Sequence, residues 1–389
     1  MIALRALFVV CIIDVLGFGI LIPLVPYMGE RFGAPPPIIT AILGSYSLCQ
    51  LLAAPFWGRL SDRYGRRPIL MSSLAGACLS YVLLALAHGL GMLLASRMLA
   101  GFMAGNLAAA FAYASDVSRP EERAKSMGLI GAAIGIGFMC GIPLGGALAG
   151  EHAQSANFVR PALVSICLSL CAIALVKLVL PESRTAEQRV QRRELGSRPL
   201  QLLRERPALR SIAGGALLVT CSQGILESIF VIWAYDRFGF GPRTVGLALF
   251  GVALLTVLMQ GGMVRVLVPR LGESLIGALG ACVYAAGLLL VAVAGTSLPV
   301  VAAGLALAGL GMGAFTPTAS ALASKQSQAG ERGAVMGTYQ ASTSLARVIG
   351  PFASGYLYTL LGSSAPFFTG ACLSVPAAWL ILHARRATK

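Results

Sequence analysis

Charged residues are scarce in this sequence: Asp, Glu, Lys and Arg make up 12% of its 389 residues, against 57% hydrophobic residues. Soluble globular proteins carry about 25% charged residues, so the composition argues against an ordinary soluble domain. The 46 glycines follow no strict repeat, which excludes collagen and is typical of helices that pack closely in lipid. All nine cysteines lie in apolar segments, so no disulfide is expected.

Residue clusters that carry out chemistry are also missing. The three histidines, His88, His152 and His383, lie in expected loops or in the C-terminal tail. There is no nucleophile–base pair, metal-ligand cluster or nucleotide-binding loop, and no polar segment is long enough to hold a separate domain. We therefore expect neither an enzyme nor a receptor, and no metal or cofactor. The net charge of +15 comes without a nucleic-acid fold signal, so no nucleic-acid partner is expected.

Long apolar runs fill most of the chain. A helix needs about 20 apolar residues to cross a hydrocarbon core of roughly 30 Å. The first run is too long for a signal peptide and lacks a small-residue cleavage site. The sequence predicts an all-α integral membrane protein with twelve transmembrane helices, at 4–28, 38–58, 69–89, 91–115, 124–150, 158–180, 208–235, 243–267, 274–295, 297–322, 333–360 and 365–384.

Basic residues are distributed unevenly between the ends of these runs. With the N-terminus inside, 24 of the 30 lysines and arginines fall on the inner side, four outside and two within spans. Basic residues accumulate in cytoplasmic loops, so both termini are expected in the cytoplasm. The longest polar connection follows the sixth run. It predicts an N-terminal six-helix bundle, a basic cytoplasmic linker and a C-terminal six-helix bundle at 1–180, 181–207 and 208–389.

The two halves of the chain repeat each other. ERAKSMG at 122–128 matches ERGAVMG at 331–337 with an offset of 209 residues, and the same offset relates Gly141 to Gly350 and Gly146 to Gly355. Two pseudo-symmetric six-helix bundles are a known plan of secondary transporters, which bind substrate near the midplane of the membrane.

The segment GRLSDRYGRRPIL, residues 58–70, places five charged residues between two apolar runs. It resembles the loop signature of the major facilitator superfamily. Further matches cover nearly the whole chain: DVLGFGILIPLVP in the first span, SRMLAG in the fourth, LPES after the sixth, YDRFGFGPRTVGLALFG after the seventh and QGGMVRVLVPRLGE after the eighth. Together they resemble the drug:proton antiporters, and the tetracycline efflux pumps in particular. The resemblance implies a monomeric transporter of the inner membrane that interacts with protons, lipids and a small-molecule substrate.

The same resemblance implies that this loop forms a latch that holds the two halves in an outward-facing state. Glycine allows a tight turn, and an aspartate there could accept from arginines or face a helix N-terminus. The alternative is that the arginines only set the topology and bind anionic lipid. The expected latch residues are Gly58, Asp62, Gly65, Arg66, Arg67 and Asp116.

The fifth and eleventh spans are expected to bend. The antiporter signature of the fifth span has adjacent Gly-Pro, but here Pro143 follows Gly141 after one intervening residue, whereas the eleventh span keeps adjacent Gly350 and Pro351. The displaced proline leaves the direction of transport open.

Four charged residues lie well inside the expected spans: Asp14, Arg97, Glu227 and Arg347. A charged side chain inside the membrane costs free energy, and such side chains usually face a cavity or each other. Asp14 lies near the midplane and matches the acidic position of the tetracycline pumps. Because loss of water favours the neutral carboxyl group, Asp14 could bind and release a proton as the cavity opens to either side. A structural carboxylate bonded to the backbone or to an arginine is the alternative.

Arg97 matches the arginine of the family's fourth-span motif, which the resemblance associates with proton coupling; a structural ion pair is the alternative. Glu227 shares a helix face with Gln223 and Phe230. This acid, amide and aromatic ring predict a surface that binds substrate or protons. Pairing of Glu227 with Arg97 or Arg347 is the alternative.

Arg347 lies on a polar stripe with Gln340, Thr343 and Ser344. The tetracycline pumps carry acids in the third and ninth spans, where this chain aligns Ser80 and Tyr284. The loss of these acids and the gain of an arginine disfavour a cationic metal–tetracycline chelate and favour a neutral, zwitterionic or anionic substrate. Further candidates for substrate contact, with ordinary inter-helix bonding or interfacial anchoring as the alternative, are Tyr46, Gln50, Asn106, Tyr113 and Trp233.

The favoured function is a proton-coupled antiporter that exports a small amphipathic, drug-like compound by alternating access. The alternative is a dedicated exporter or symporter of an endogenous metabolite, lipid or siderophore, anionic or zwitterionic. The direction of transport in vesicles with an imposed pH gradient would separate the two.

Overall fold

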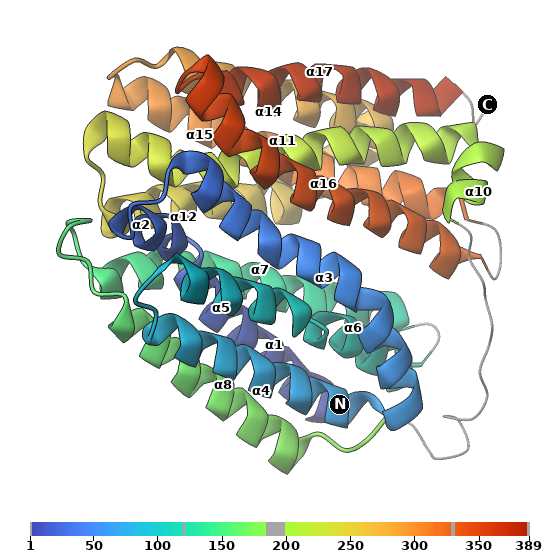
Figure 1. The fold of residues 1–389 in the computed structure, drawn as a ribbon. Helices are drawn as coiled ribbons and strands as arrows, with labels where there is room; N and C mark the ends of the chain where they lie inside the picture. Colours follow the sequence, from blue (N-terminus) through green and yellow to red (C-terminus); the bar gives the residue numbers. More distant parts are fainter. Residues whose placement is uncertain (1, 120–121, 184–198, 328–330, 387–389) are drawn as a thin grey trace. The chain divides into compact units, whose positions relative to one another are not determined.

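A computed structural model describes residues 2–119, 122–183, 199–327 and 331–386. These residues form helices and no strands (Figure 1), as the apolar composition predicts, because a helix satisfies every backbone N–H and C=O within its own segment. Most of the expected linker, 184–198, lies outside the described residues.

The N-terminal half contains the helices of the first six expected spans. They are α1 (Ile2–Leu21) with α2 (Leu24–Arg31), α3 (Pro36–Tyr64), α4 (Arg66–Ala85), α5 (Leu90–Phe102) with α6 (Asn106–Asp116), α7 (Arg123–Ala149) and α8 (Val159–Val179).

The C-terminal half contains the remaining six. After the short helix α10 (Pro199–Glu205) come α11 (Pro207–Phe238), α12 (Pro242–Leu258) with the π-helical turn η1 (Met259–Met263) and α13 (Val264–Leu271), α14 (Glu273–Val293), α15 (Leu298–Lys325), α16 (Arg332–Leu361) and α17 (Ala365–Arg386).

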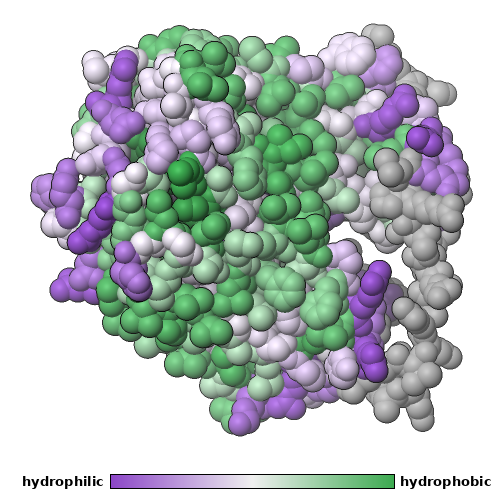
Figure 2. All heavy atoms as spheres, in the orientation of Figure 1, coloured by the Kyte–Doolittle hydropathy of each residue, from purple (hydrophilic) through white to green (hydrophobic). Residues whose placement is uncertain are grey.

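Eleven helical segments of the described chain are long and apolar enough to cross a membrane. The expected span at 333–360 is helix α16, which has 30 residues but a lower hydropathy because of Arg347 and its polar neighbours. Large apolar side chains are exposed on the outside of the helices; Leu178 is 82% and Leu360 76% exposed. On the face shown in Figure 2, hydrophobic side chains cover the sides of the helices and hydrophilic ones gather near their ends.

Three of the expected spans are not single α-helices, which corrects the sequence prediction. The first divides at Pro23, which has no backbone N–H to donate, and the fourth divides between Phe102 and Asn106. The eighth contains the π-turn η1. Interrupted helices inside a membrane need other groups to satisfy the freed backbone, and such interruptions are typical of binding sites in transporters.

The contacts of the chain define two compact units. The first unit comprises Met1–Pro35, Ser45–Arg193 and Gly239–Phe250, and the second comprises Pro36–Gly44, Glu194–Phe238 and Gly251–Lys389. The start of α12 therefore belongs to the first unit, where Pro242 lies against Gly146 of α7. The start of α3 belongs to the second, where Pro37 lies against Gly355 of α16. The division at 1–180, 181–207 and 208–389 stays a prediction about folding domains.

The internal packing of the two units repeats. In the first unit α1 packs on α7 and α8, and α4 on α8; in the second, α11 packs on α16 and α17, and α14 on α17. A Cβ on Gly141 would lie 2.6 Å from the carbonyl oxygen of Leu16, and one on Gly350 would lie 2.6 Å from that of Cys221. The offset of 209 residues read from the sequence thus relates equivalent glycine contacts.

Close helix packing in the first unit gives a stability prediction. A Cβ on Gly145 of α7 would overlap the carbonyl oxygen of Ile20, and overpacking of this kind costs about 1–3 kcal/mol. We expect Gly145→Ala to lower the thermal unfolding midpoint of the detergent-solubilised protein. Gly131→Ala on the same helix is the matched control, because a Cβ there would meet no described atom within 4 Å; an equal loss in both variants would contradict the packing argument.

Candidate functional site

Asp14 of α1 is buried in the first unit, with 8% of its surface exposed. Its Oδ2 accepts a hydrogen bond from Nδ2 of Asn106, the first residue of α6. Within the described part of the chain no cation forms an ion pair with Asp14, which argues against the alternative of a carboxylate fixed by an arginine.

A small cavity adjoins Asp14. The volume open to the centre of a water molecule is about 10 Å³, which matches the roughly 10–15 Å³ that one water requires. Its walls come from α1, α4 and α6, and the lining residues are Val10, Cys11, Asp14, Leu70, Leu74, Asn106, Leu107 and Ala110. A carboxyl group with one amide donor and space for one water can hold a proton or exchange it.

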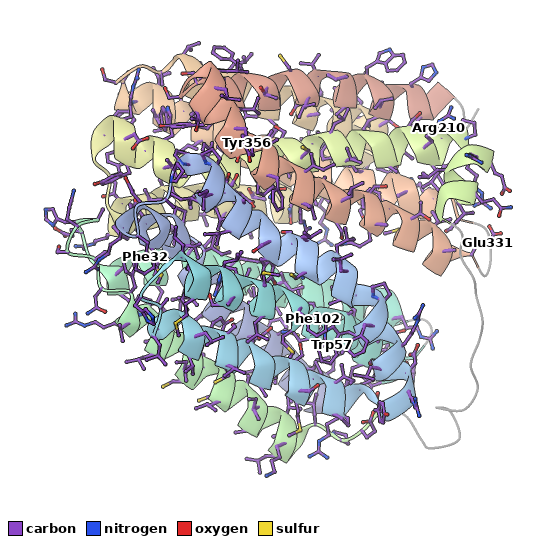
Figure 3. The ribbon with its side chains drawn as sticks, viewed as in Figure 1. Phe32, Trp57, Phe102, Arg210, Glu331 and Tyr356 are labelled. Atoms are coloured by element: carbon purple, nitrogen blue, oxygen red, sulfur yellow. The ribbon has the colours of Figure 1, made fainter. Side chains whose placement is uncertain are left out.

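The break between α5 and α6 positions Asn106. The indole Nε1 of Trp57 donates to the carbonyl oxygen of Phe102 at 2.5 Å, and Figure 3 shows the two residues side by side. The hydroxyl of Ser73 donates to the carbonyl oxygen of Met103 and accepts from the N–H of Asn106 at 2.9 Å. These side chains bond the backbone groups that the interruption frees. Neither Trp57 nor Ser73 was a candidate from the sequence.

Arg97 of α5 is buried, with 3% of its surface exposed. Its Nε lies 3.4 Å from the hydroxyl of Ser96, and its Nη2 has no hydrogen-bond partner within the described residues. Tyr46 and Tyr81 are the ionisable groups that interact with it. A buried donor without a partner costs about 1–3 kcal/mol, so its presence calls for an explanation, and a functional role is one. The structural ion pair that the sequence left open is not formed by the described residues.

Glu227 of α11 is exposed, although most residues of this helix are buried. Nε2 of Gln223 donates to its Oε1 at 2.7 Å, as the spacing of one turn predicts. Arg347 of α16 acts electrostatically on Glu227 without forming an ion pair within 4.0 Å. Glu227 and Gln223 therefore form one polar pair on an accessible face of the second unit.

The polar stripe of α16 lies in the same unit. Gln340 and Arg347 are exposed, and Ser344 is partly exposed between them. Thr343 is 6% exposed, and its hydroxyl donates to the carbonyl oxygen of Gln340 at 3.0 Å. The stripe thus offers an amide and a guanidinium group to a ligand, whereas the threonine hydroxyl bonds to its own helix.

Phe230 is not on the exposed face. It is 1% exposed and packs against Trp233, with ring centroids 6.1 Å apart. The structure therefore does not bring Phe230 together with Glu227 as an accessible surface. Trp233 is likewise buried, with 2% of its surface exposed, so the structure does not present it to a substrate on this face.

The other contact candidates lie in the first unit. Tyr46 and Gln50 are partly exposed on α3, and Tyr46 stacks on Phe18 with centroids 4.7 Å apart. Tyr113 is buried and donates to the carbonyl oxygen of Pro181 at 2.9 Å, a structural contact. Ser80, aligned with an acid of the tetracycline pumps, donates to its own helix at Ala77.

The charged loop between α3 and α4 forms a compact network. Arg66 is buried, and its Nη1 lies 3.0 Å from Oδ1 of Asp62 and 2.9 Å from the hydroxyl of Ser61. Its Nε lies 3.0 Å from Oδ2 of Asp116 at the end of α6. Three expected latch residues, Asp62, Arg66 and Asp116, are therefore brought together. Their role as a latch stays a prediction.

Glu182 completes this network and was missed as a candidate. Its two carboxylate oxygens accept from the backbone N–H groups of Arg66 and Arg67 at 2.9 and 3.2 Å. A carboxylate is favoured at a helix N-terminus, here that of α4, because of the free N–H groups and the helix dipole. The signal was present in the sequence, since Glu182 is the acid of LPES directly after the sixth span. The sequence left open that Asp62 faces a helix N-terminus. At the start of α4 it is Glu182 that accepts from the free N–H groups.

The glycines of the loop differ in role. Gly65 makes the turn, with φ of +101°, and a Cβ there would lie 2.5 Å from Oε2 of Glu182. Gly58 lies inside α3, and a Cβ on it would meet no described atom within 4 Å. The tight turn expected of the loop glycines is therefore made at Gly65 and not at Gly58. Pro143 and Pro351 lie inside α7 and α16, which continue past them.

The fold and these residues define a class of protein. Each unit repeats the same helix packing, and ionisable side chains lie within the spans of both units, as in secondary transporters. Among the described residues no group of three His, Cys, Asp or Glu side chains could hold a metal ion.

Comparison with known proteins identifies the family. The sequence profile of the Major Facilitator Superfamily matches residues 7–296 and 212–389, and the chain belongs to this superfamily. It is therefore a multi-pass membrane transporter and not an enzyme.

Its relatives include two tetracycline resistance proteins. The chain is 31% identical to the class G protein of Vibrio anguillarum over 89% of this chain and 88% of that one. It is 29% identical to the class B protein of Escherichia coli over 93% and 89%. The resemblance to tetracycline efflux pumps read from the sequence is confirmed. Among solved structures, the human organic anion transporter MFSD10 superposes with a TM-score of 0.73 at 26% identity, covering 97% of this chain and 98% of that one.

Proposed function

We propose that this transporter is a proton-coupled antiporter that exports a small amphipathic organic compound by alternating access. It acts as a monomer in the inner membrane with both termini in the cytoplasm. The observation that carries the proposal is Asp14: a buried carboxyl group inside a span, with one amide donor and a cavity for one water. The tetracycline resistance proteins among its relatives support efflux as the direction.

The two units have different roles: the first binds the proton and the second binds the substrate. Asp14 of the first unit carries the proton, because none of the described residues is a counter-ion for it and it exchanges protons only when water reaches it. Arg97 is a second candidate for proton coupling, because it is buried and its Nη2 has no hydrogen-bond partner within the described residues. Glu227, Gln223, Gln340 and Arg347 of the second unit contact the substrate. One proton that crosses 100 mV yields about 2.3 kcal/mol, which sustains a gradient of about 50-fold.

Arg347 supports a second candidate, a dedicated exporter or symporter of an anionic or zwitterionic endogenous compound. Its guanidinium group is exposed and forms no ion pair among the described residues, so it can bind a carboxylate or phosphate group. The name of the human organic anion transporter points to the same substrate class for that protein.

The experiment is transport by the purified protein in liposomes with an imposed pH difference. A fluorescent organic anion and a neutral amphipathic compound are tested in parallel. We expect at least one of them to move against the direction of proton flow. Movement of the compound with the protons would identify a symporter and contradict the antiport proposal. Protein-free liposomes are the control for leakage.

A further inference from the structure

The start of α14 in the second unit is the counterpart of the start of α4 in the first. Gly272 precedes α14 with φ of +82°, and Gly65 precedes α4 with φ of +101°. In the first unit the free N–H groups of the helix end bind the carboxylate of Glu182. A Cβ on Gly65 would strike this carboxylate, but a Cβ on Gly272 would meet no described atom within 4 Å.

A pocket lies at the start of α14. The volume open to the centre of a water molecule is about 300 Å³. It is formed by the ends of α11, α13, α14, α15 and α17, and its lining residues are Ile212, Leu271, Gly272, Glu273, Ser274, Leu275, Leu322, Lys325, Gln326 and Ala384. One part of the lining is apolar and the other carries an acid, a base, an amide and a hydroxyl group.

The hydroxyl group of Ser274 is available to bind a ligand. Ser274 lines the pocket and is 7% exposed, yet its side chain has no hydrogen bond to any described residue. The backbone N–H groups of Glu273 and Ser274 likewise have no described acceptor, since the first turn of a helix offers none and Gly272 has no side chain to cap it. The hydroxyl group of Ser274 and the free N–H groups of the first turn of α14 therefore lie at this pocket without a described partner, and an oxyanion can accept hydrogen bonds from all of them.

The pocket also contains a carboxylate, that of Glu273, which can bind a cation. Nζ of Lys325 lies 2.6 Å from Oε2 of Glu273. The pair leaves one carboxylate oxygen free to accept and two ammonium hydrogens free to donate. A simple anion would be repelled by Glu273, whereas a molecule with one ammonium and one phosphate group matches both ends.

We propose that this pocket binds the headgroup of a zwitterionic aminophospholipid. The lipid ammonium group donates to Glu273. The phosphate accepts from Lys325, from the hydroxyl group of Ser274 and from the N–H groups of the first turn of α14. The apolar lining, from Leu271, Leu275 and Leu322, contacts the glycerol and the upper acyl chains, because these residues lie at helix ends where spans meet the headgroup region.

Native mass spectrometry of the delipidated full-length protein tests this. Phosphatidylethanolamine and phosphatidylglycerol with identical acyl chains are titrated separately. We expect phosphatidylethanolamine to bind more tightly, and both Lys325→Met and Glu273→Gln to weaken it about tenfold, as loss of a charge-assisted hydrogen bond does. Arg265→Met is the matched control, because Arg265 is an exposed cation of α13 outside the pocket, and it should leave binding unchanged.

Three outcomes would overturn the proposal. If phosphatidylglycerol bound as tightly and Glu273→Gln strengthened its binding, the pocket would be a simple anion site. If soluble phosphoethanolamine competed as well as the lipid, the ligand would be a water-soluble metabolite. If neither variant differed from Arg265→Met, the bound lipid would be adventitious.

Discussion

Asp14→Asn is expected to abolish uphill export driven by a pH difference while substrate exchange across the membrane continues. Asparagine has the size of the aspartate and can still bond to Asn106, but it cannot bind and release a proton. The substitution therefore removes the coupled ion without opening a cavity in the core around Asp14, which is 8% exposed. Proton-driven transport and counterflow exchange in the same liposomes measure the two properties separately.

Glu151→Gln is the matched control for Asp14→Asn. Glu151 is an exposed carboxylate of the same unit, paired with Arg243, and lies between the spans α7 and α8. Its neutralisation should leave both coupling and exchange intact. If Asp14→Asn still accumulated substrate on a pH difference, another group would carry the proton and the mechanism proposed above would be wrong.

Arg347→Gln is expected to weaken the binding of organic anions about 10- to 100-fold and to leave neutral compounds little changed. One charge-assisted hydrogen bond from the guanidinium group, worth about 1.5–3 kcal/mol, accounts for this range. Binding is measured by thermal stabilisation of the purified protein with each compound. The prediction follows from the exposed position of Arg347 on α16 near Glu227.

Arg210→Gln is the control for Arg347→Gln. Arg210 is an exposed arginine of α11 in the same unit, near the end of the helix, and its loss changes the net charge equally. Equal effects of both substitutions would mean that only the overall field of the protein matters. Transport of the cationic metal–tetracycline chelate by the unmodified protein in liposomes would contradict the preference for a neutral, zwitterionic or anionic substrate.

The sequence predicted the fold and the family because both depend on local features. Apolar length alone requires helices in a membrane, and the charged loop with its glycines marks the superfamily. The repeat was also visible, since Gly141 and Gly350 occupy equivalent contacts. The pairing of Gln223 with Glu227 needed only the spacing of one helical turn.

Other parts of the candidate site depend on residues far apart in the sequence. The break before Asn106 is stabilised by Trp57 and Ser73 from two other helices, so apolar length predicted one continuous span. The exposure of Phe230 depends on which face of α11 its neighbours cover, and a helix with apolar residues on every side gives no sign of this.

The sequence by itself determined that this chain is a helical membrane transporter with ionisable groups inside its spans. Hydropathy, charge and motif spacing are properties of short segments, and the membrane acts on each segment directly. Only the tertiary structure decided that Asn106 bonds to Asp14, that Glu182 binds the start of α4 and that Ser274 lines a pocket at α14. Each of these depends on side chains that packing brings together from separate helices, and no local pattern records which helices become neighbours.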